Sequence, residues 1–140
     1  MEQWQSLQAL WPEKRLIIEG SAHIRCDENW LGEAFQNLLK NACEHTSDEG
    51  VIRVQLERTE AAFFCIIEDN GGGVATDELP KLFQRFYRAQ HQNKNGAGIG
   101  LAIVKEIIQR HHGNIVAENG KHGLKMTISM PMLDRNLTNS

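Results

Sequence analysis

The sequence lacks the features that mark several classes of protein. Its 140 residues contain no signal-peptide pattern and no apolar run of about 18 residues, so we expect this segment neither to contact a membrane nor to carry an export signal. A basic excess is also missing, because 15 Lys and Arg stand against 18 Asp and Glu, for a net charge of −3. Surfaces that bind nucleic acid carry a basic excess, so no nucleic-acid partner is expected.

Cysteine is scarce, and its spacing argues against two further classes. The three cysteines, Cys26, Cys43 and Cys65, lie far apart and form no Cys-x-x-Cys pair. An odd, scattered set favours a reducing compartment over a disulfide framework. Cys43 and Cys65 fall in or beside apolar runs, where a thiol behaves as a small hydrophobic group. The six histidines are dispersed as well, so we expect no metal site built from Cys and His.

The apolar patterning predicts a single α+β domain. No repeat or low-complexity segment occurs, and 41% apolar with 24% charged residues is an ordinary composition. Periodicity predicts strands at residues 15–19, 22–26, 51–56, 62–68, 114–118 and 126–130, and helices from after Asp27 to residue 42, at 76–83 and at about 98–111. We therefore expect a two-layer α/β sandwich, in which helices cover one face of a mixed, mostly antiparallel sheet.

Six of the twelve glycines gather in two clusters, within residues 71–73 and 96–100. Glycine loses much backbone entropy on folding, so clusters this dense indicate that another group approaches the backbone closely. The second cluster leads into an apolar helix, and a glycine turn before a helix N-terminus offers N–H groups to a phosphate. Asp69, before the first cluster, can accept a hydrogen bond from an amino group, although a plain Asp-Asn-Gly turn is an alternative. Together they suggest a nucleotide held by its base and by its phosphates.

Two asparagines, Asn37 and Asn41, lie one turn apart on the long predicted helix, beside its apolar stripe. A carboxamide oxygen is a neutral ligand that suits Mg²⁺, which keeps its other positions for water and phosphate. The alternative is that these side chains cap a neighbouring strand or turn. Arg85, Arg88 and Lys94 lie in the polar loop 84–95, where they can reach a terminal phosphate or are simply solvated.

Four segments in order tie these features together. They are residues 37–42 (Asn-Leu-Leu-Lys-Asn-Ala), 69–73 (Asp-Asn-Gly-Gly-Gly), 82–88 (Leu-Phe-Gln-Arg-Phe-Tyr-Arg) and 96–104 (Gly-Ala-Gly-Ile-Gly-Leu-Ala-Ile-Val). In order and spacing they resemble the N, G1, F and G2 boxes of the catalytic and ATP-binding domain of sensor histidine kinases, in the GHKL (Bergerat) superfamily. Residues 120–123 resemble the last glycine box of that family.

The resemblance implies a site for ATP and Mg²⁺. Asn41 would ligate Mg²⁺, Asn37 would assist at the phosphates, and Arg85 or Arg88 would neutralise the γ-phosphate. The implied catalytic residues are therefore Asn37, Asn41 and Arg85, and the implied metal ligand is Asn41.

The other boxes would hold the nucleotide itself. By the same resemblance Asp69 would bind the adenine amino group, with Gly73 and Val74 lining the base, and residues 87–95 would form a lid over ATP. The glycines of the G2 box, at a helix N-terminus, would hold the triphosphate. The implied nucleotide-binding residues are Asn37, Asn41, His45, Asp69, Gly71, Gly73, Val74, Tyr87, Arg88, Gly96, Gly98, Ile99, Gly100 and Leu101.

Asn37 also bears on the reaction. Hydrolytic relatives in this superfamily carry a glutamate four residues before the Mg²⁺ asparagine, where it activates water, and an asparagine cannot act as a base. In sensor kinases the acceptor histidine and its base lie on a separate domain, so Asn37 favours phosphoryl transfer to histidine. A GHKL ATPase remains an alternative. So does a non-catalytic nucleotide-sensing module, because Glu44 stands where the family usually has a basic residue.

The resemblance also implies how the chain is organised and what it works with. We expect residues 1–14 to be a linker or the end of a dimerisation helix, 15–132 the catalytic domain and 133–140 a C-terminal tail. None of the six histidines lies in a phospho-acceptor motif, so the chain should bind ATP without phosphorylating itself. The implied partners are its own dimerisation and phospho-acceptor domain and a cognate response regulator. The isolated domain should be a monomer, and the implied location is cytoplasmic, within a membrane-anchored sensor kinase.

Overall fold

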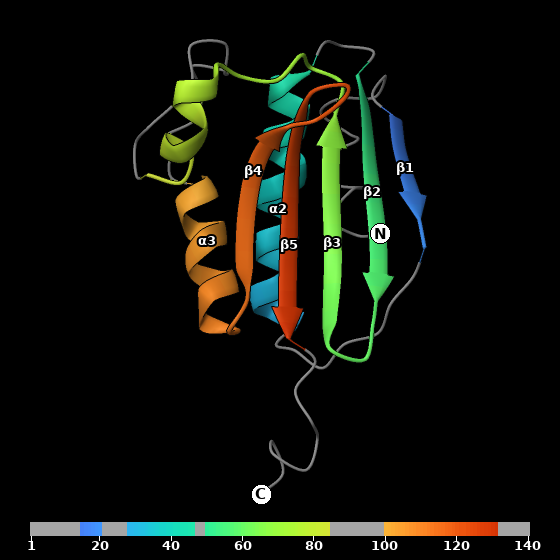
Figure 1. Cartoon of the computed structure of the whole chain (residues 1–140), viewed down its shortest axis with the longest axis vertical. Helices are drawn as coiled ribbons and strands as arrows, with labels where there is room; N and C mark the ends of the chain where they lie inside the picture. The colour runs from blue at the N-terminus through green and yellow to red at the C-terminus, as the bar shows by residue number, and fades with distance from the viewer. Residues whose placement is uncertain (1–14, 21–27, 47–49, 85–99, 132–140) are drawn as a thin grey trace, which may run out of the picture.

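The described part of the chain contains five strands and three helical elements in one sheet-and-helix domain. The computed structural model describes residues 15–20, 28–46, 50–84 and 100–131. In chain order the elements are β1 (Arg15–Glu19), α2 (Glu28–His45), β2 (Val51–Arg58), β3 (Ala62–Asp69), η1 (Thr76–Lys81), α3 (Gly100–Arg110), β4 (Asn114–Asn119) and β5 (Leu124–Pro131). Helices α2 and α3 cover one face of the sheet and leave the other open (Figure 1).

The strands lie in the order β1-β2-β3-β5-β4. β1 and β2 run parallel, since α2 forms the crossover between them, and the remaining neighbours are antiparallel. β3 is central and pairs with β5 from Ala62 opposite Pro131 to Glu68 opposite Lys125. This topology confirms the predicted two-layer α/β sandwich with a mixed, mostly antiparallel sheet.

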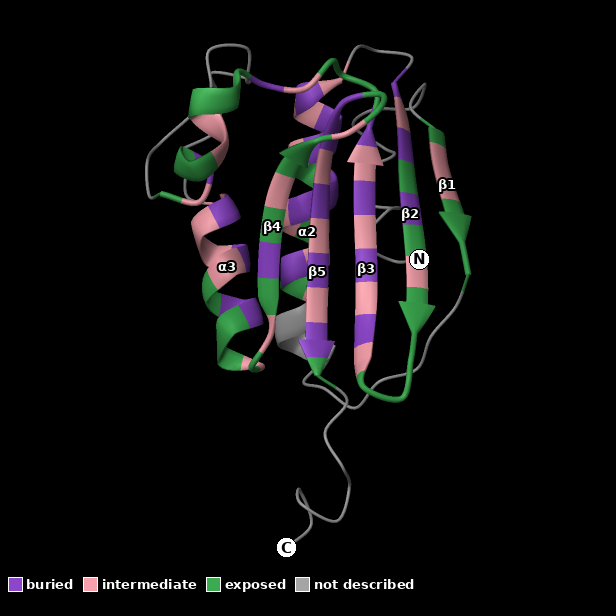
Figure 2. Cartoon of the chain, viewed as in Figure 1, coloured by how far each residue is buried: buried purple, intermediate pink, exposed green. Residues whose placement is uncertain are grey.

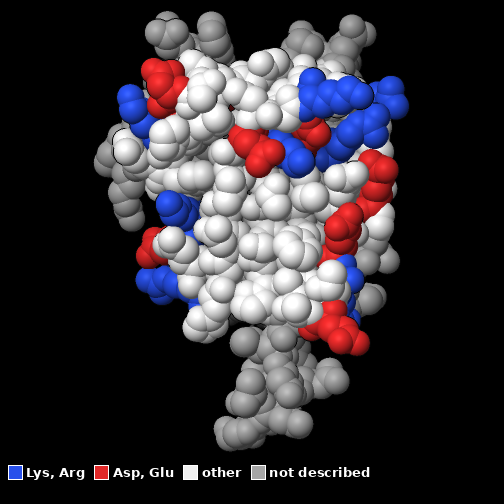
Figure 3. Space-filling model, in the orientation of Figure 1, with Lys and Arg blue, Asp and Glu red and all other residues white. Residues whose placement is uncertain are grey.

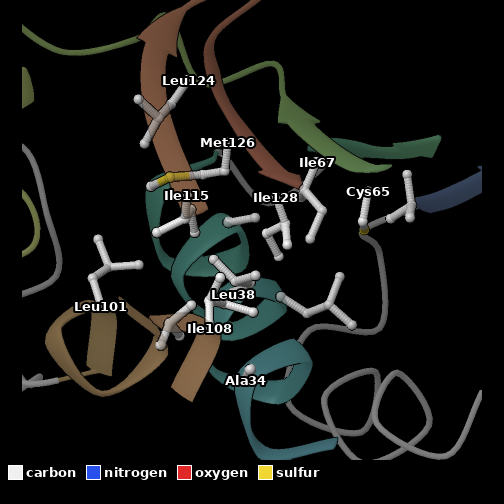
Figure 4. Packing of buried hydrophobic residues seen from close by; sticks show 14 of the residues in the cluster. Ala34, Leu38, Cys65, Ile67, Leu101, Ile108, Ile115, Leu124, Met126 and Ile128 are labelled. Atoms are coloured by element: carbon white, nitrogen blue, oxygen red, sulfur yellow. The ribbon is translucent and has the colours of Figure 1, made fainter. Parts of the chain in front are cut away.

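The hydrophobic core lies between the sheet and the two helices. Side chains alternate along β3 and β5, so that every second residue is buried against the helices (Figure 2). Leu38 of α2, Ile108 of α3 and Ile128 of β5 are at most 2% exposed and meet in this layer (Figure 4). The buried side chains of β3 and β5 therefore form the layer against which α2 and α3 pack.

Two described cysteines are part of this core. Cys43 and Cys65 form no disulfide and both are buried, which agrees with their prediction as small hydrophobic groups. Burial raises the pKa of the Cys65 thiol from 9.0 to about 12. This thiol therefore stays protonated at neutral pH and serves in packing.

Predicted boundaries differ from the structure at η1 and at β5. The segment after residue 76 forms a 3-10 helix that ends at Lys81, shorter than the predicted helix 76–83, and it contains Pro80, which has no N–H to continue a helix. β5 begins at Leu124 rather than Met126, because Leu124 already pairs with Asn119. The predicted strand 22–26, the N-terminal segment and the C-terminal tail lie outside the described residues. Among the described helices, none is long and apolar enough to cross a membrane.

The open face of the sheet carries a row of alternating charges near the end that holds the loops. Arg53 lies opposite Glu68, Glu68 opposite Lys125, and Lys125 opposite Glu118. Opposite charges on adjacent strands each contribute roughly 0.2–1 kcal/mol. Charged side chains gather at the upper end of this face, while its centre is largely uncharged (Figure 3).

The end of α3 carries a local strain that can be relieved. His112 has φ 64 and is the non-glycine residue with positive φ among those described, and Gly113 N donates to Ile108 O at 2.9 Å just beyond it. A side chain in this region costs roughly 1–2 kcal/mol, so His112→Gly should raise the free energy of unfolding by about 1 kcal/mol. Urea denaturation of the variant and of wild type measures this difference in the free energy of unfolding. Gln109→Gly, inside the same helix, should instead lower stability by about 1 kcal/mol. A His112→Gly domain no more stable than wild type would contradict the prediction.

Candidate functional site

Helix α2 places the asparagines and a histidine on one side. Asn37, Asn41 and His45 follow at four-residue steps; both asparagines are half-buried and His45 is buried. The C-terminal end of α2 lies near the segment after β3 and the β4–β5 turn, at the upper end of the molecule (Figure 1). The predicted arrangement of the two asparagines on one side of a helix is therefore confirmed.

The side chain of Asn37 lies between α2 and the start of α3. Its Nδ2 donates to Glu33 O at 3.0 Å, one turn back along α2. Its Oδ1 faces Gly100, since a Cβ on that glycine would lie 3.2 Å from this oxygen. The first turn of α3 carries no acidic residue. The described contacts of Asn37 are with its own helix and α3, not with a strand.

Asp69 is a buried carboxylate with several donors around it. It is 3% exposed, and its Oδ1 accepts from Gly71 N at 2.9 Å and Leu124 N at 3.3 Å. His45 Nδ1 lies 3.3 Å from Oδ2 and 3.4 Å from Oδ1. A carboxylate only accepts hydrogen bonds, so Nδ1 carries the proton in this pair. Asp69 thus has a fixed orientation at the end of β3, held from α2 and from β5.

At each position of the first glycine cluster, the structure of the chain itself disfavours a side chain. A Cβ on Gly71 would lie 2.3 Å from His45 O, and one on Gly73 would lie 2.3 Å from Asn119 Oδ1. Gly72 has open space around it but a φ of +88. These glycines are predicted to let a base approach, and the structure shows that α2 and β4 also approach the same segment closely.

The β4–β5 turn contacts this segment and was not among the predicted site residues. Asn119 Oδ1 accepts from Val74 N at 2.9 Å, and Asn119 Nδ2 donates to Val74 O at 2.8 Å. Gly72 N donates to His122 O at 3.4 Å. A carboxamide at the end of a predicted strand, just before a glycine turn, was the available signal, but its partner lies 45 residues away.

The remaining predicted site residues divide into two groups. Val74 and Leu101 are described, and both side chains are buried in the hydrophobic core, at 8% and 7% exposed. Phe83 of the third box packs against this core, with Lys105 Nζ of α3 5.6 Å from its ring centroid. The predicted site residues that lie outside the described residues are Arg85, Tyr87, Arg88, Gly96, Gly98 and Ile99.

A small cavity opens beside Asp69. It has a volume of about 160 Å³ and is lined by Val51, Arg53, Glu68, Asp69, Asn70 and His122. That volume is below the roughly 300 Å³ at which ligand pockets begin, and it shares only Asp69 with the predicted site. Within the described residues, no three His, Cys, Asp or Glu side chains are grouped as a metal site.

A family model matches this arrangement of boxes. The model described as histidine kinase-, DNA gyrase B-, and HSP90-like ATPase matches residues 26–134. The chain belongs to this family. Membership in this ATPase family confirms the resemblance drawn from the four boxes, and ATP is the nucleotide that the family name gives for this fold.

Curated relatives of this ATPase-family chain are sensor kinases. It is 34% identical over 122 residues to the probable sensor kinase SilS of Salmonella typhimurium, covering 85% of this chain and 23% of that protein. It is 34% identical over 131 residues to the heme sensor protein HssS of Staphylococcus saprophyticus, covering 90% of this chain and 28% of that protein. The chain thus spans about a quarter of the length of these relatives.

A solved structure supports the fold of this ATPase-family chain independently. The mycobacterial sensor histidine kinase MprB superposes with a TM-score of 0.85 at 24% identity, covering 93% of this chain and 91% of that one. At this identity the likeness concerns the fold. It agrees with the α+β sandwich described above.

Proposed function

We propose that this chain is the ATP-binding catalytic domain of a sensor histidine kinase, which binds ATP with Mg²⁺ and passes the γ-phosphoryl group to a histidine on a separate dimerisation domain. One observation carries the proposal: Asn37 faces the start of α3, while His45 on the same helix contacts Asp69. Eight residues of helix span about 12 Å. α2 therefore ties a phosphate end and a base end together at a separation that suits an extended nucleotide.

At the base end, Asp69 would accept a hydrogen bond from the adenine amino group. Its Oδ1 already accepts from two backbone N–H groups, which leaves Oδ2, beside His45, as the oxygen for the base. Because the carboxylate is held from two elements, it would meet the base without reorientation. Preorganisation of this kind lowers the entropic cost of binding.

At the phosphate end, the N-terminus of α3 and the asparagines of α2 would act together. Helix N-terminal N–H groups favour phosphate oxygens. Asn41, half-buried one turn after Asn37, would offer an amide oxygen to Mg²⁺. That ion prefers oxygen ligands and keeps several waters, so one amide oxygen with phosphate oxygens is a sufficient set. When bound, Mg²⁺ supplies charge neutralisation at the phosphates.

The donor pattern of Asn37 favours transfer over hydrolysis. A hydrolase needs a group that removes a proton from water, and the carboxamide of Asn37, with its Nδ2 committed to Glu33 O at 3.0 Å, has no basic atom. Phosphoryl transfer needs mainly positioning and charge neutralisation. The phosphoryl group would pass to a histidine of the dimerisation domain and from there to a response regulator. Both transfers would take place in the cytoplasm.

The proposal is tested by supplying the acceptor separately. With ATP and Mg²⁺ at 100 times the dissociation constant, the free energy of unfolding should rise by about 2.7 kcal/mol, and EDTA should remove most of this gain. Label from γ-labelled ATP should appear on histidine of an added sensor-kinase dimerisation domain, and none on the chain alone. Steady phosphate release without transfer would support an ATPase. Binding without either would support a nucleotide-sensing module, and no stabilisation by ATP would overturn the proposal.

A further inference from the structure

Asn119, the last residue of β4, holds a backbone segment that belongs to the base end of the site. Its side chain bonds to both polar groups of the Val74 backbone, accepting from Val74 N at 2.9 Å and donating to Val74 O at 2.8 Å. This is the bonding pattern of a neighbouring strand, supplied by one carboxamide. Val74 is only 8% exposed, so the contact fixes a residue whose side chain is already anchored in the core.

The adjoining glycine is shaped for this contact. A Cβ on Gly73 would lie 2.3 Å from Asn119 Oδ1, and Gly73 has φ +77. Both features disfavour a side chain at residue 73. The backbone therefore approaches the Asn119 side chain at Gly73, where any other residue would place a side chain against that carboxamide.

The same turn also reaches Asp69. His122 O accepts from Gly72 N at 3.4 Å, and Leu124 N donates to Asp69 Oδ1 at 3.3 Å. The turn 119–124 therefore contacts residues 69–74 at both ends and in the middle. Asn119 makes two of these hydrogen bonds through its side chain, whereas His122 and Leu124 make theirs through backbone atoms.

We propose that Asn119 is a positioning residue for the nucleotide base, acting through Val74 and Gly73 on the placement of the segment that follows Asp69. The inference rests on the proposed ATP site. Asn119 need not touch the nucleotide. Its removal frees both backbone groups of Val74 to bond with water, so the segment 71–74 samples more conformations and binding bears the cost of ordering it.

The test compares Asn119→Ala with wild type in the affinity for ATP and for adenosine. Loss of both hydrogen bonds should weaken binding about tenfold. The factor should be the same for both ligands, because the effect lies at the base. Asn119→Asp keeps the acceptor for Val74 N but sets a carboxylate oxygen against Val74 O, where Nδ2 donates at 2.8 Å in wild type. Two acceptors repel each other, so this variant should bind no more tightly than Asn119→Ala. Asn114→Ala, at the other end of β4, is the matched control and should bind as wild type does.

The outcomes separate the inference from the proposed function. Affinities are measured at a temperature where urea titration shows each variant to be folded, so that lost stability does not count as lost affinity. If wild type binds neither ligand, the proposed function fails. If wild type binds and Asn119→Ala binds equally well, or loses affinity for ATP but not adenosine, the role of Asn119 is overturned while the ATP site stands.

Discussion

The Asp69→Asn domain should fold and yet bind ATP at least about 100-fold more weakly than wild type, a loss of about 2.7 kcal/mol. Asparagine keeps an oxygen at the position that accepts from Gly71 N and Leu124 N. The second oxygen, beside His45 Nδ1 at 3.3 Å, becomes an NH₂ group. The imidazole can adapt by moving its proton to Nε2 and accepting from the new amide. An adenine amino group has no such choice, because it would meet a donor where it needs an acceptor.

Titration calorimetry of ATP against the Asp69→Asn and wild-type domains measures this loss. Thermal unfolding without nucleotide measures whether the fold is kept. Asp77→Asn, which removes an exposed carboxylate in η1, is the matched control for the change in net charge and should leave affinity unchanged. An Asp69→Asn domain that is folded and binds ATP within threefold of wild type would exclude Asp69 as the contact to the base.

Local patterns were sufficient to predict much of the fold. The β2–β3 hairpin follows from two runs of β-branched and aromatic residues around a polar turn, and β3 ends at Asp69, one residue beyond the predicted strand 62–68. The pairing of β3 with β5 could not be read in the same way, because Ala62 and Pro131 meet only after the chain has crossed through α3 and β4. Long-range register depends on how the helices pack, which no short window of sequence contains.

The same distinction between local and long-range contacts applies to the candidate site. The spacing of Asn37 and Asn41 placed them on one side of a helix, since that geometry is local. The contacts of Asp69 with His45 and Leu124, and of Asn119 with Val74, join residues 24, 55 and 45 positions apart. Glycines 71–73 are predicted to give a ligand room to approach, and the structure adds a second role, because Gly71 and Gly73 also make room for the chain itself.

That second role of glycine predicts unequal effects within one cluster. Gly72→Ala meets no atom within 4 Å but must adopt φ +88, so it should lower the free energy of unfolding by roughly 1–2 kcal/mol. Gly73→Ala meets the same backbone penalty at φ +77 and also places its Cβ 2.3 Å from Asn119 Oδ1. Displacing Asn119 loses two hydrogen bonds at about 1 kcal/mol each. The total for Gly73→Ala should therefore reach about 3–4 kcal/mol, a large share of the 5–15 kcal/mol that holds a domain together.

Urea denaturation of both single variants and of Gly73→Ala with Asn119→Ala resolves the two parts of this loss. In the double variant the obstructing carboxamide is gone, so the alanine at residue 73 should add only the backbone penalty of roughly 1–2 kcal/mol to the loss caused by Asn119→Ala alone. The two changes should thus be non-additive, as expected for side chains that compete for one space. Strict additivity, or equal losses for Gly72→Ala and Gly73→Ala, would mean that Asn119 moves aside at no cost. The carboxamide would then be too loosely held to position the base-binding segment.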